Sequence, residues 1–312
     1  MRIASIIGAL TGLLSLGSAA SLTNPLKKTN GSDPFMVYAD GYYYLMTTTW
    51  TNLQLTRAKT LEGLKNGETK VVWTDTNSAR CCNVWAPEIH KIDNTWYIYY
   101  TAGNGNNLDG QRPHLVLRWQ LTNDWGIDGS VLRVSNQNYF VWSCFPEPDV
   151  QSLCIAPMTS PTSIGSRSVL SRPTNAWERV GSPPAVNEGA APLYHNGRVF
   201  LAYSASFCWT SSYQLGLLTY NGGDPTSSSS WTKTGPYFSS ANRNYGPGHN
   251  AFFTSPDGKE VWNVYHATWI QSGACDGNRY TAAQKVNWRA DGTPDFGSPQ
   301  PTGTVLVGPS GE

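Results

Sequence analysis

The chain has 312 residues, a formal net charge of +1 and only 14% charged residues, against 12% aromatic residues that include 13 tryptophans. A surface so close to neutral offers no electrostatic attraction to nucleic acid or to an anionic membrane, so neither is expected as a partner. Many aromatic side chains and few charges suit a protein that handles neutral ligands by stacking and hydrogen bonding, and sugars are the obvious class.

The first twenty residues predict a secretory signal peptide. The segment MRIASIIGALTGLLSLGSAA has an early arginine, a short apolar run and small residues at its end, which is typical of cleavage after Ala20. A membrane anchor is the alternative, but the apolar run is short for a bilayer span. We therefore expect a secreted, extracellular protein in which residues 21–312 form a single domain.

The rest of the chain repeats one strand pattern and shows no sustained helical period. A turn dipeptide precedes an aromatic or β-branched strand in DGYYYLMTT from Asp40, DNTWYIYYTA from Asp93, NQNYFVWSC from Asn136, NGRVFLAYSAS from Asn196 and DGKEVWNVYHAT from Asp257. Such dipeptides supply the positive φ of tight hairpins. All-β repeats roughly 40 to 60 residues apart favour propeller blades of four strands, so we predict a five-bladed β-propeller. A β-sandwich with coincidentally similar hairpins is the alternative.

One residue with functional potential stands seven or eight positions before each turn: Asp33, Trp85, Asp128, Glu188 and His249. In a propeller the innermost strand of each blade lines the central channel, so these residues are expected together at the channel mouth. Taken singly, each has an ordinary explanation, such as a turn aspartate, a solvated glutamate or a core histidine. At one position of a repeat, they predict a site.

Three converging carboxylates suit the hydrolysis of a glycosidic bond. The reaction needs a general acid for the leaving oxygen, and either a base for water or a carboxylate nucleophile. A third carboxylate can keep the acid protonated by like-charge repulsion. Glu188 precedes the apolar run Gly-Ala-Ala-Pro, which favours its protonated form, so it is the candidate acid. Trp85 is a candidate to stack on the face of a sugar.

The cysteine count predicts disulfides. All six cysteines follow the predicted signal peptide, and an even number in an oxidising compartment favours pairing. Six cysteines allow many pairings, so the connectivity stays open. Cys144 and Cys154 are close enough to close a small loop, and Cys208 and Cys275 are able to join distant segments. No cysteine and histidine spacing suggests zinc.

From about Asn24 to its end the chain resembles glycoside hydrolase family 43. The resemblance rests on NPLKKTNGSDPFMVYADGYYYLMTTT, NVWAPEIHKIDNTWYIYYTAG, WGIDGSVL, NEGAAPLYHNGRVFLAYSAS, GPGHNAFF and NWRADGTPDFGSP. It implies a five-bladed fold and inversion at the anomeric carbon. It also implies that Asp33 is the general base, that Asp128 modulates pKa and positioning, and that Glu188 is the general acid. His249 is expected at the channel, where it binds a water or a hard cation such as structural calcium; no cofactor is required.

The phrases CCNVWAPEIH and YYYLMTTTW are most similar to those of secreted, exo-acting α-L-arabinofuranosidases within the family. This implies a monomer that releases terminal arabinofuranosyl residues from arabinan or other arabinose-containing polysaccharides. Phe35, Trp85 and His249 are then expected to contact the sugar. Similar sequences often carry an arginine beside the Ala-Gln pair before the last strand; here Arg279, slightly earlier, is the candidate cationic contact.

Other functions remain open on the same scaffold. A β-xylosidase or an endo-arabinanase would use the same fold and the same acids. A carbohydrate-binding propeller without catalysis is a further alternative. The complete set of three acids argues against it, because binding alone needs no matched acid and base.

Overall fold

The computed structural model describes residues 20–105, 108–115 and 119–312. Strands dominate the described chain, and its helical turns are the three short 3-10 segments η1 (Glu62–Asn66), η2 (Ala176–Glu178) and η3 (Ser228–Ser230). The all-β class predicted from the sequence is confirmed. Within the described ranges no helix has the length and apolar character that a bilayer span requires. The predicted signal peptide, residues 1–20, falls almost wholly outside the described residues.

Two four-stranded sheets come first. The first contains β2 (Phe35–Ala39), β3 (Tyr42–Met46), β4 (Leu53–Ala58) and β5 (Glu68–Trp73), and the second contains β6 (Cys82–Ile92), β7 (Thr95–Gly103), β8 (Arg112–Leu115) and β9 (Trp119–Gln120). Their strands pair antiparallel in chain order. The predicted hairpin turns hold: Asp40 and Gly41 take φ of 50° and 81°, and Asp93 takes 47°.

A nine-stranded sheet follows, made of two antiparallel sets. The first set is β10 (Gly126–Val134), β11 (Gln137–Glu147) and β12 (Val150–Ser160), with β13 (Ser163–Ile164) and β14 (Ser168–Ser171) on β12. The second set is β15 (Ala185–His195), β16 (Arg198–Ala205), β17 (Gln214–Tyr220) and β18 (Trp231–Phe238). Only a short parallel contact, Val150 with Ala185 and Gln151 with Val186, joins β12 to β15.

The last large sheet contains β19 (Tyr245–Thr254), β20 (Val261–Thr268) and β21 (Arg279–Lys285), and the N-terminal segment runs along its outer edge. The Leu26 N–H donates to the Thr281 carbonyl, and the Thr281 N–H donates to the Lys27 carbonyl. The side chain of Asn24 bonds both backbone groups of Ala283. The segment of residues 24–27 therefore supplies a further antiparallel partner to the last sheet.

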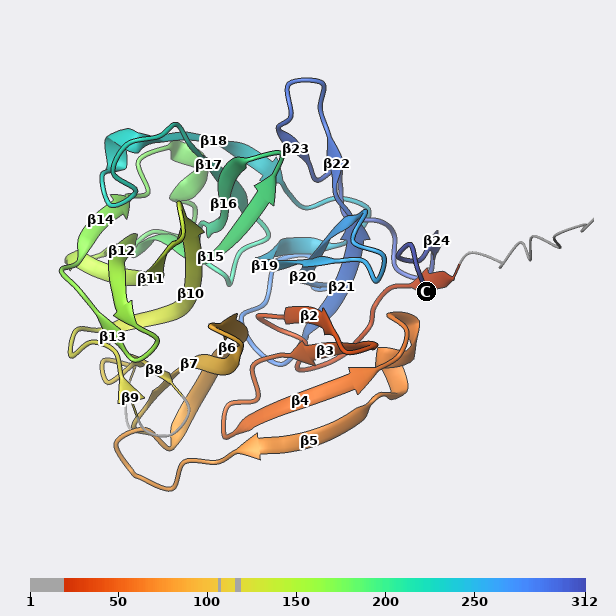
Figure 1. Ribbon diagram of the computed structural model, residues 1–312, viewed down its shortest axis with the longest axis horizontal. Helices are drawn as coiled ribbons and strands as arrows, with labels where there is room; N and C mark the ends of the chain where they lie inside the picture. Colours follow the sequence, from red (N-terminus) through yellow and green to blue (C-terminus); the bar gives the residue numbers. More distant parts are fainter. Residues whose placement is uncertain (1–19, 106–107, 116–118) are drawn as a thin grey trace, which may run out of the picture.

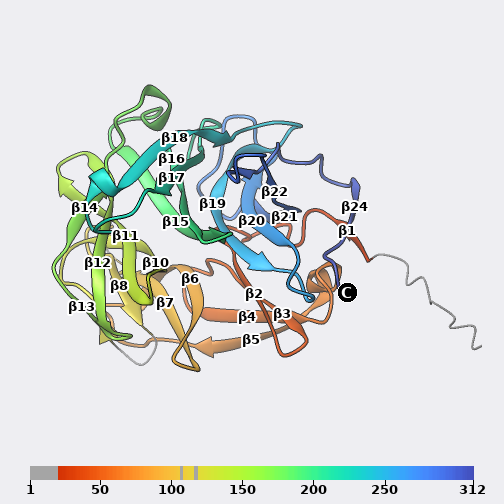
Figure 2. The ribbon, with the colours of Figure 1, turned by 45° about the horizontal axis from the view of Figure 1, so that its top comes forward.

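Two small sheets lie near the chain ends. β1 (Ser21–Thr23) pairs with β24 (Val305–Val307), so the two ends of the described chain lie side by side (Figure 1). β22 (Asn287–Trp288) pairs with β23 (Pro294–Asp295). Figures 1 and 2 show the large sheets following one another in chain order around a common central region.

One type of contact links each set of strands to the next. A side chain in the last part of a second strand, or just after it, bonds the backbone in the first half of the next innermost strand or just before that strand. The contacts are Thr48 with the Ala86 N–H, Thr101 with the Asp128 N–H, Ser143 with the Asn187 carbonyl, Ser204 with the His249 N–H, and His266 with the Asp33 N–H. The last of these joins the final sheet to the first, so the series closes on itself. Apolar clusters fill the space between neighbours; for example, the Tyr99 ring of β7 lies 5.7 Å from the Phe140 ring of β11.

Candidate active site

Asp33, Asp128 and His249 occupy equivalent places in the repeat: Asp33 lies two residues before β2, Asp128 is the third residue of β10, and His249 is the fifth residue of β19. Each takes a left-handed backbone conformation, with φ of 54°, 58° and 40°. In β10 and β19 the residue falls where the pairing with the next strand is irregular. Bulges of this kind bend a strand and re-aim a side chain. The repeat thereby brings the side chains of three sheets together.

Trp85 and Glu188 lie one residue earlier in the repeat than predicted. They pair with Thr101 and Ser204, ahead of the bulges, and the equivalent left-handed positions belong to Ala86 and Gly189, with φ of 44° and 58°. The expectation that all five residues share one position was therefore wrong for these two. Ala86-Pro87 in the second sheet corresponds to Asp33-Pro34 in the first. This shared proline indicates in the sequence that Ala86, and not Trp85, is equivalent to Asp33.

Asp33 is buried and surrounded by donors. Its Oδ1 lies 3.3 Å from Nδ1 of His249 and 3.3 Å from Nη1 of Arg279, while its Oδ2 accepts the Thr48 hydroxyl at 2.5 Å. Burial alone would raise the pKa of Asp33, but the Arg279 guanidinium and the His249 ring hold it well below its ordinary value. Asp33 is therefore ionised and suited to accept a proton from water.

Asp128 shares His249 with Asp33 but lacks the arginine. Its Oδ2 lies 3.7 Å from Nδ1 of His249, and its side chain is 6% exposed. Burial, with the nearby charges of Glu188 and Asp33, raises the pKa of Asp128 to about 8 against the opposing effect of His249. The pKa values of the two aspartates are thus shifted in opposite directions, because only Asp33 contacts a permanent cation.

Glu188 is held at both carboxyl oxygens. The Tyr213 hydroxyl donates to Oε1 and the Gln151 amide donates to Oε2, each at 2.8 Å. Burial raises the pKa of Glu188, outweighing His249 and these two hydrogen bonds, which lower it. Gly189, the next residue, is required by the packing, since a Cβ there would lie 3.0 Å from Cγ of His249. Glu188 is thus a fixed carboxyl group whose protonated form is favoured.

His249 lies between the acids. Burial disfavours its charged form, but the carboxylates of Asp128, Asp33 and Glu188 together raise its pKa. Its Nδ1 faces two of these carboxylates, which leaves only Nε2 for a cation or a water. Among the residues that the structure describes, no three His, Cys, Asp or Glu side chains are arranged to hold a metal ion.

Three neighbours of the cluster were not predicted. His266 is fully buried, and burial together with the charge of Arg279 lowers its pKa to about 3. Its ring is therefore neutral and accepts the Asp33 N–H at 3.1 Å. Glu88 is a further carboxyl group; it is buried, and its Oε2 lies 2.7 Å from Nε2 of His90. Tyr213 is buried beside Glu188, and burial holds the pKa of its hydroxyl well above the usual value, so it remains a donor.

The predicted sugar contacts lie in different surroundings. Arg279 reaches Asp33, as described above. The Trp85 ring meets the Trp50 ring edge-on, with centroids 5.8 Å apart. Phe35 lies two residues beyond Asp33 in the chain; its ring is 4.9 Å from His90, and it lines a cavity of about 150 Å³ with Glu88. The structure therefore brings Arg279 to the acids and places Phe35 further along the chain, at the start of β2.

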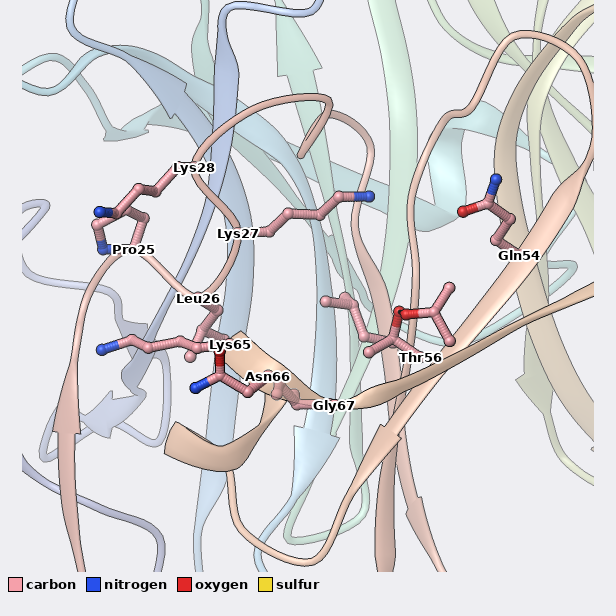
Figure 3. Close-up of a pocket in the computed structure, with 12 residues that line it drawn as sticks. Pro25, Leu26, Lys27, Lys28, Gln54, Thr56, Lys65, Asn66 and Gly67 are labelled. Carbon is pink, nitrogen blue, oxygen red and sulfur yellow. Dashed lines mark hydrogen bonds between the residues drawn. The ribbon is translucent and has the colours of Figure 1, made fainter.

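A larger groove lies elsewhere. It measures about 590 Å³ and runs between the N-terminal segment, β4 and η1, with Lys27, Lys65 and Gln54 among its lining residues (Figure 3). None of the three predicted acids lines it. The carboxyl cluster, rather than this groove, therefore defines the candidate active site.

A buried cluster with one carboxyl group held ionised and another favoured in its protonated form is the arrangement of a glycosidase. The comparison with protein families agrees: the chain belongs to glycosyl hydrolases family 43, whose model matches residues 22–294. It is thus a glycoside hydrolase.

The chain is similar to several proteins that are named as arabinofuranosidases. An extracellular exo-alpha-(1->5)-L-arabinofuranosidase of Streptomyces avermitilis is 35% identical over 98% of this chain and 72% of that protein. Alpha-L-arabinofuranosidase B of Pyricularia oryzae is 34% identical over 91% of this chain and 64% of its own length. This chain thus spans only part of these relatives. Among solved structures, an alpha-L-arabinofuranosidase from Lactobacillus brevis has a TM-score of 0.82 and 31% identity, covering 90% of this chain and 98% of that one.

Proposed function

We propose that this protein is a secreted, monomeric, inverting α-L-arabinofuranosidase that removes terminal arabinofuranosyl residues from arabinan or related polysaccharides. The observation that supports this most is the opposite displacement of two pKa values in one buried cluster, downward for Asp33 and upward for Glu188. The substrate follows from similarity to enzymes named as arabinofuranosidases, two of which are named extracellular.

The architecture we infer is a single five-bladed β-propeller over residues 21–312. The nine-stranded sheet counts as two blades, since only two residue pairs join its halves. The N-terminal segment along β21 supplies the fourth strand of the last blade. The closed series of contacts from Thr48 to His266 supports a ring of five.

In the proposed mechanism Asp33 removes a proton from a water on one face of the sugar. Glu188 donates its proton to the departing oxygen on the other face, while the water attacks the anomeric carbon. Asp128 and His249 set the charge around the two reacting carboxyl groups, and Thr48 and Arg279 hold Asp33 ionised. The chemistry requires no redox cofactor. A cation, if bound, contacts Nε2 of His249 and takes its other ligands from water, as a structural aid.

Substrate choice and stereochemistry provide the test. Hydrolysis of 4-nitrophenyl α-L-arabinofuranoside but not of the β-xyloside is expected, and linear arabinan should release arabinose alone. Mixed oligosaccharides would indicate an endo-arabinanase, and preference for the xyloside a β-xylosidase. Proton NMR should show the β-anomer of arabinose first; the α-anomer first would mean retention and would refute the roles of Asp33 and Glu188.

A further inference from the structure

Trp209 is an exposed indole on a loop whose two ends lie beside Glu188: Ser204, just before the loop, pairs with Glu188, and Tyr213, at its end, bonds the Glu188 carboxyl group. It lies between β16 and β17, on the loop of residues 206–213, and 51% of its surface is exposed. It makes no hydrogen bond, ion pair or ring contact with any residue that the structure describes. A half-exposed indole on a loop that borders the candidate site is available to stack on a sugar.

The loop that carries Trp209 is firmly held. The neighbouring Cys208 is joined to Cys275 by a disulfide, and the Phe207 N–H donates to the Val180 carbonyl. Gly273 packs so closely that a Cβ there would lie 2.4 Å from the Thr210 carbonyl carbon. An aromatic side chain presented on a fixed backbone loses little conformational entropy when it binds a ligand.

The same loop ends at the proposed acid. Tyr213, four residues after Trp209, donates its hydroxyl to Oε1 of Glu188 at 2.8 Å. A general acid protonates the leaving oxygen, so the departing part of the substrate must lie on the Glu188 side of the cleaved bond. The loop that carries Trp209 therefore borders the Glu188 side of the site, and Trp209 is only a few residues of chain away from Tyr213.

A nearby indole does not compete for this role. Trp269 is 46% exposed, but its Nε1 atom donates to the Thr302 hydroxyl and its ring lies 4.6 Å from that of Tyr280. Its orientation is thus fixed by the protein, whereas that of Trp209 is not.

We infer that Trp209 forms the subsite for the penultimate sugar, the residue that carries the leaving oxygen, by stacking its indole on the apolar face of that sugar. This inference rests on the proposed function and extends it to the leaving-group side. The near-neutral surface favours an uncharged sugar there, since stacking requires no ionic partner.

The test compares two substrates that differ only beyond the cleaved bond. Arabinotriose places a sugar next to Trp209, while methyl α-L-arabinofuranoside does not. Trp209→Ala should lower kcat/KM for arabinotriose roughly 3- to 10-fold, mainly through KM, and leave the methyl glycoside unaffected. Trp209→Phe should recover part of the loss.

The matched control is Trp96→Ala. Trp96 is also exposed, at 40%, but it lies beside the hairpin between β6 and β7. This is the end of β7 away from Thr101, which contacts Asp128. It should change neither rate. Equal effects of Trp209→Ala on both substrates, or none on either, would overturn the subsite alone. A wild-type protein that hydrolyses neither arabinoside would overturn the proposed function, and the subsite with it.

Discussion

Tyr213 contacts Glu188 and His266 at once. Its hydroxyl donates to Oε1 of Glu188 at 2.8 Å, while its ring stacks on that of His266 with centroids 5.5 Å apart and planes 11° from parallel. His266 in turn accepts the Asp33 N–H. A single tyrosine thereby connects the surroundings of the proposed acid to those of the proposed base.

Tyr213→Phe should move the alkaline limb of the pH–rate profile to higher pH. The hydrogen bond stabilises ionised Glu188 and lowers its pKa, so losing the bond raises that pKa and keeps the acid protonated further into the alkaline range. The rate at the optimum should fall about 10-fold, since the carboxyl group loses one of its two anchors. Tyr265→Phe, which removes a buried hydroxyl bonded to Gln284, is the control and should leave the limb in place. An unchanged limb in Tyr213→Phe would contradict the assignment of Glu188 as acid.

Arg279→Met should move the acidic limb to higher pH. The base must be ionised, and Arg279 is the leading cause that lowers the pKa of Asp33. Without the guanidinium, burial prevails, the pKa of Asp33 rises, and activity on the acidic side is lost sooner. Arg289→Met removes an exposed arginine from the surface and should not change the profile. A profile of Arg279→Met that superimposes on the wild type would show that Asp33 is not the titrating base.

Asp128→Asn should move the alkaline limb to lower pH. Asp128 and Glu188 repel each other when both are ionised, so the second proton of the pair is retained to higher pH than either group would hold alone. Removing one charge ends that repulsion, and Glu188 then ionises at lower pH. The measurement is kcat/KM against pH with an unactivated arabinoside. A shift to higher pH would mean that Asp128 acts through hydrogen bonding rather than charge.

Glu188→Ala should discriminate between substrates by their leaving groups. Poor leaving groups need protonation, so arabinobiose should be cleaved about 10² to 10⁴ times more slowly. Dinitrophenyl arabinofuranoside needs little help and should lose far less. Asp33→Ala should slow both substrates similarly, because water must be activated in either case. Equal losses for both substrates in Glu188→Ala would reverse or remove the assignment of the acid.

The sequence predicted the fold better than the details of the site. The hairpins at Asp40, Asp93 and Asn196 appear where the turn dipeptides indicated, because such turns are specified locally. The pairings Cys144–Cys154 and Cys208–Cys275 match the candidates considered, and Cys81 pairs with its neighbour Cys82.

The site was predicted only in part, for a physical reason. Asp33, Asp128 and His249 could be found because they recur at one position of a repeat. Tyr213 and Gln151 could not, since each belongs to an outer part of its sheet and reaches Glu188 only after the sheets pack. Trp85 and Glu188 were selected by a spacing of eight residues before the turn, which fits Asp128 only when the turn is taken to begin at Asn136. Because β10 ends at Val134, the turn begins one residue sooner and the true spacing is seven.

The segment that runs along β21 leads, within a few residues, to Asp33. Three of the groups that hold the Asp33 carboxylate and its N–H come from the far end of the chain: His249, His266 and Arg279. During synthesis the proposed base therefore leaves the ribosome well before His249, His266 and Arg279 do. A partly made chain thus has its acids but lacks the partners that set their charges. Hydrolytic competence is in this way tied to synthesis of the chain through β21, and a molecule truncated before β21 would lack Arg279, the cation that contacts Asp33.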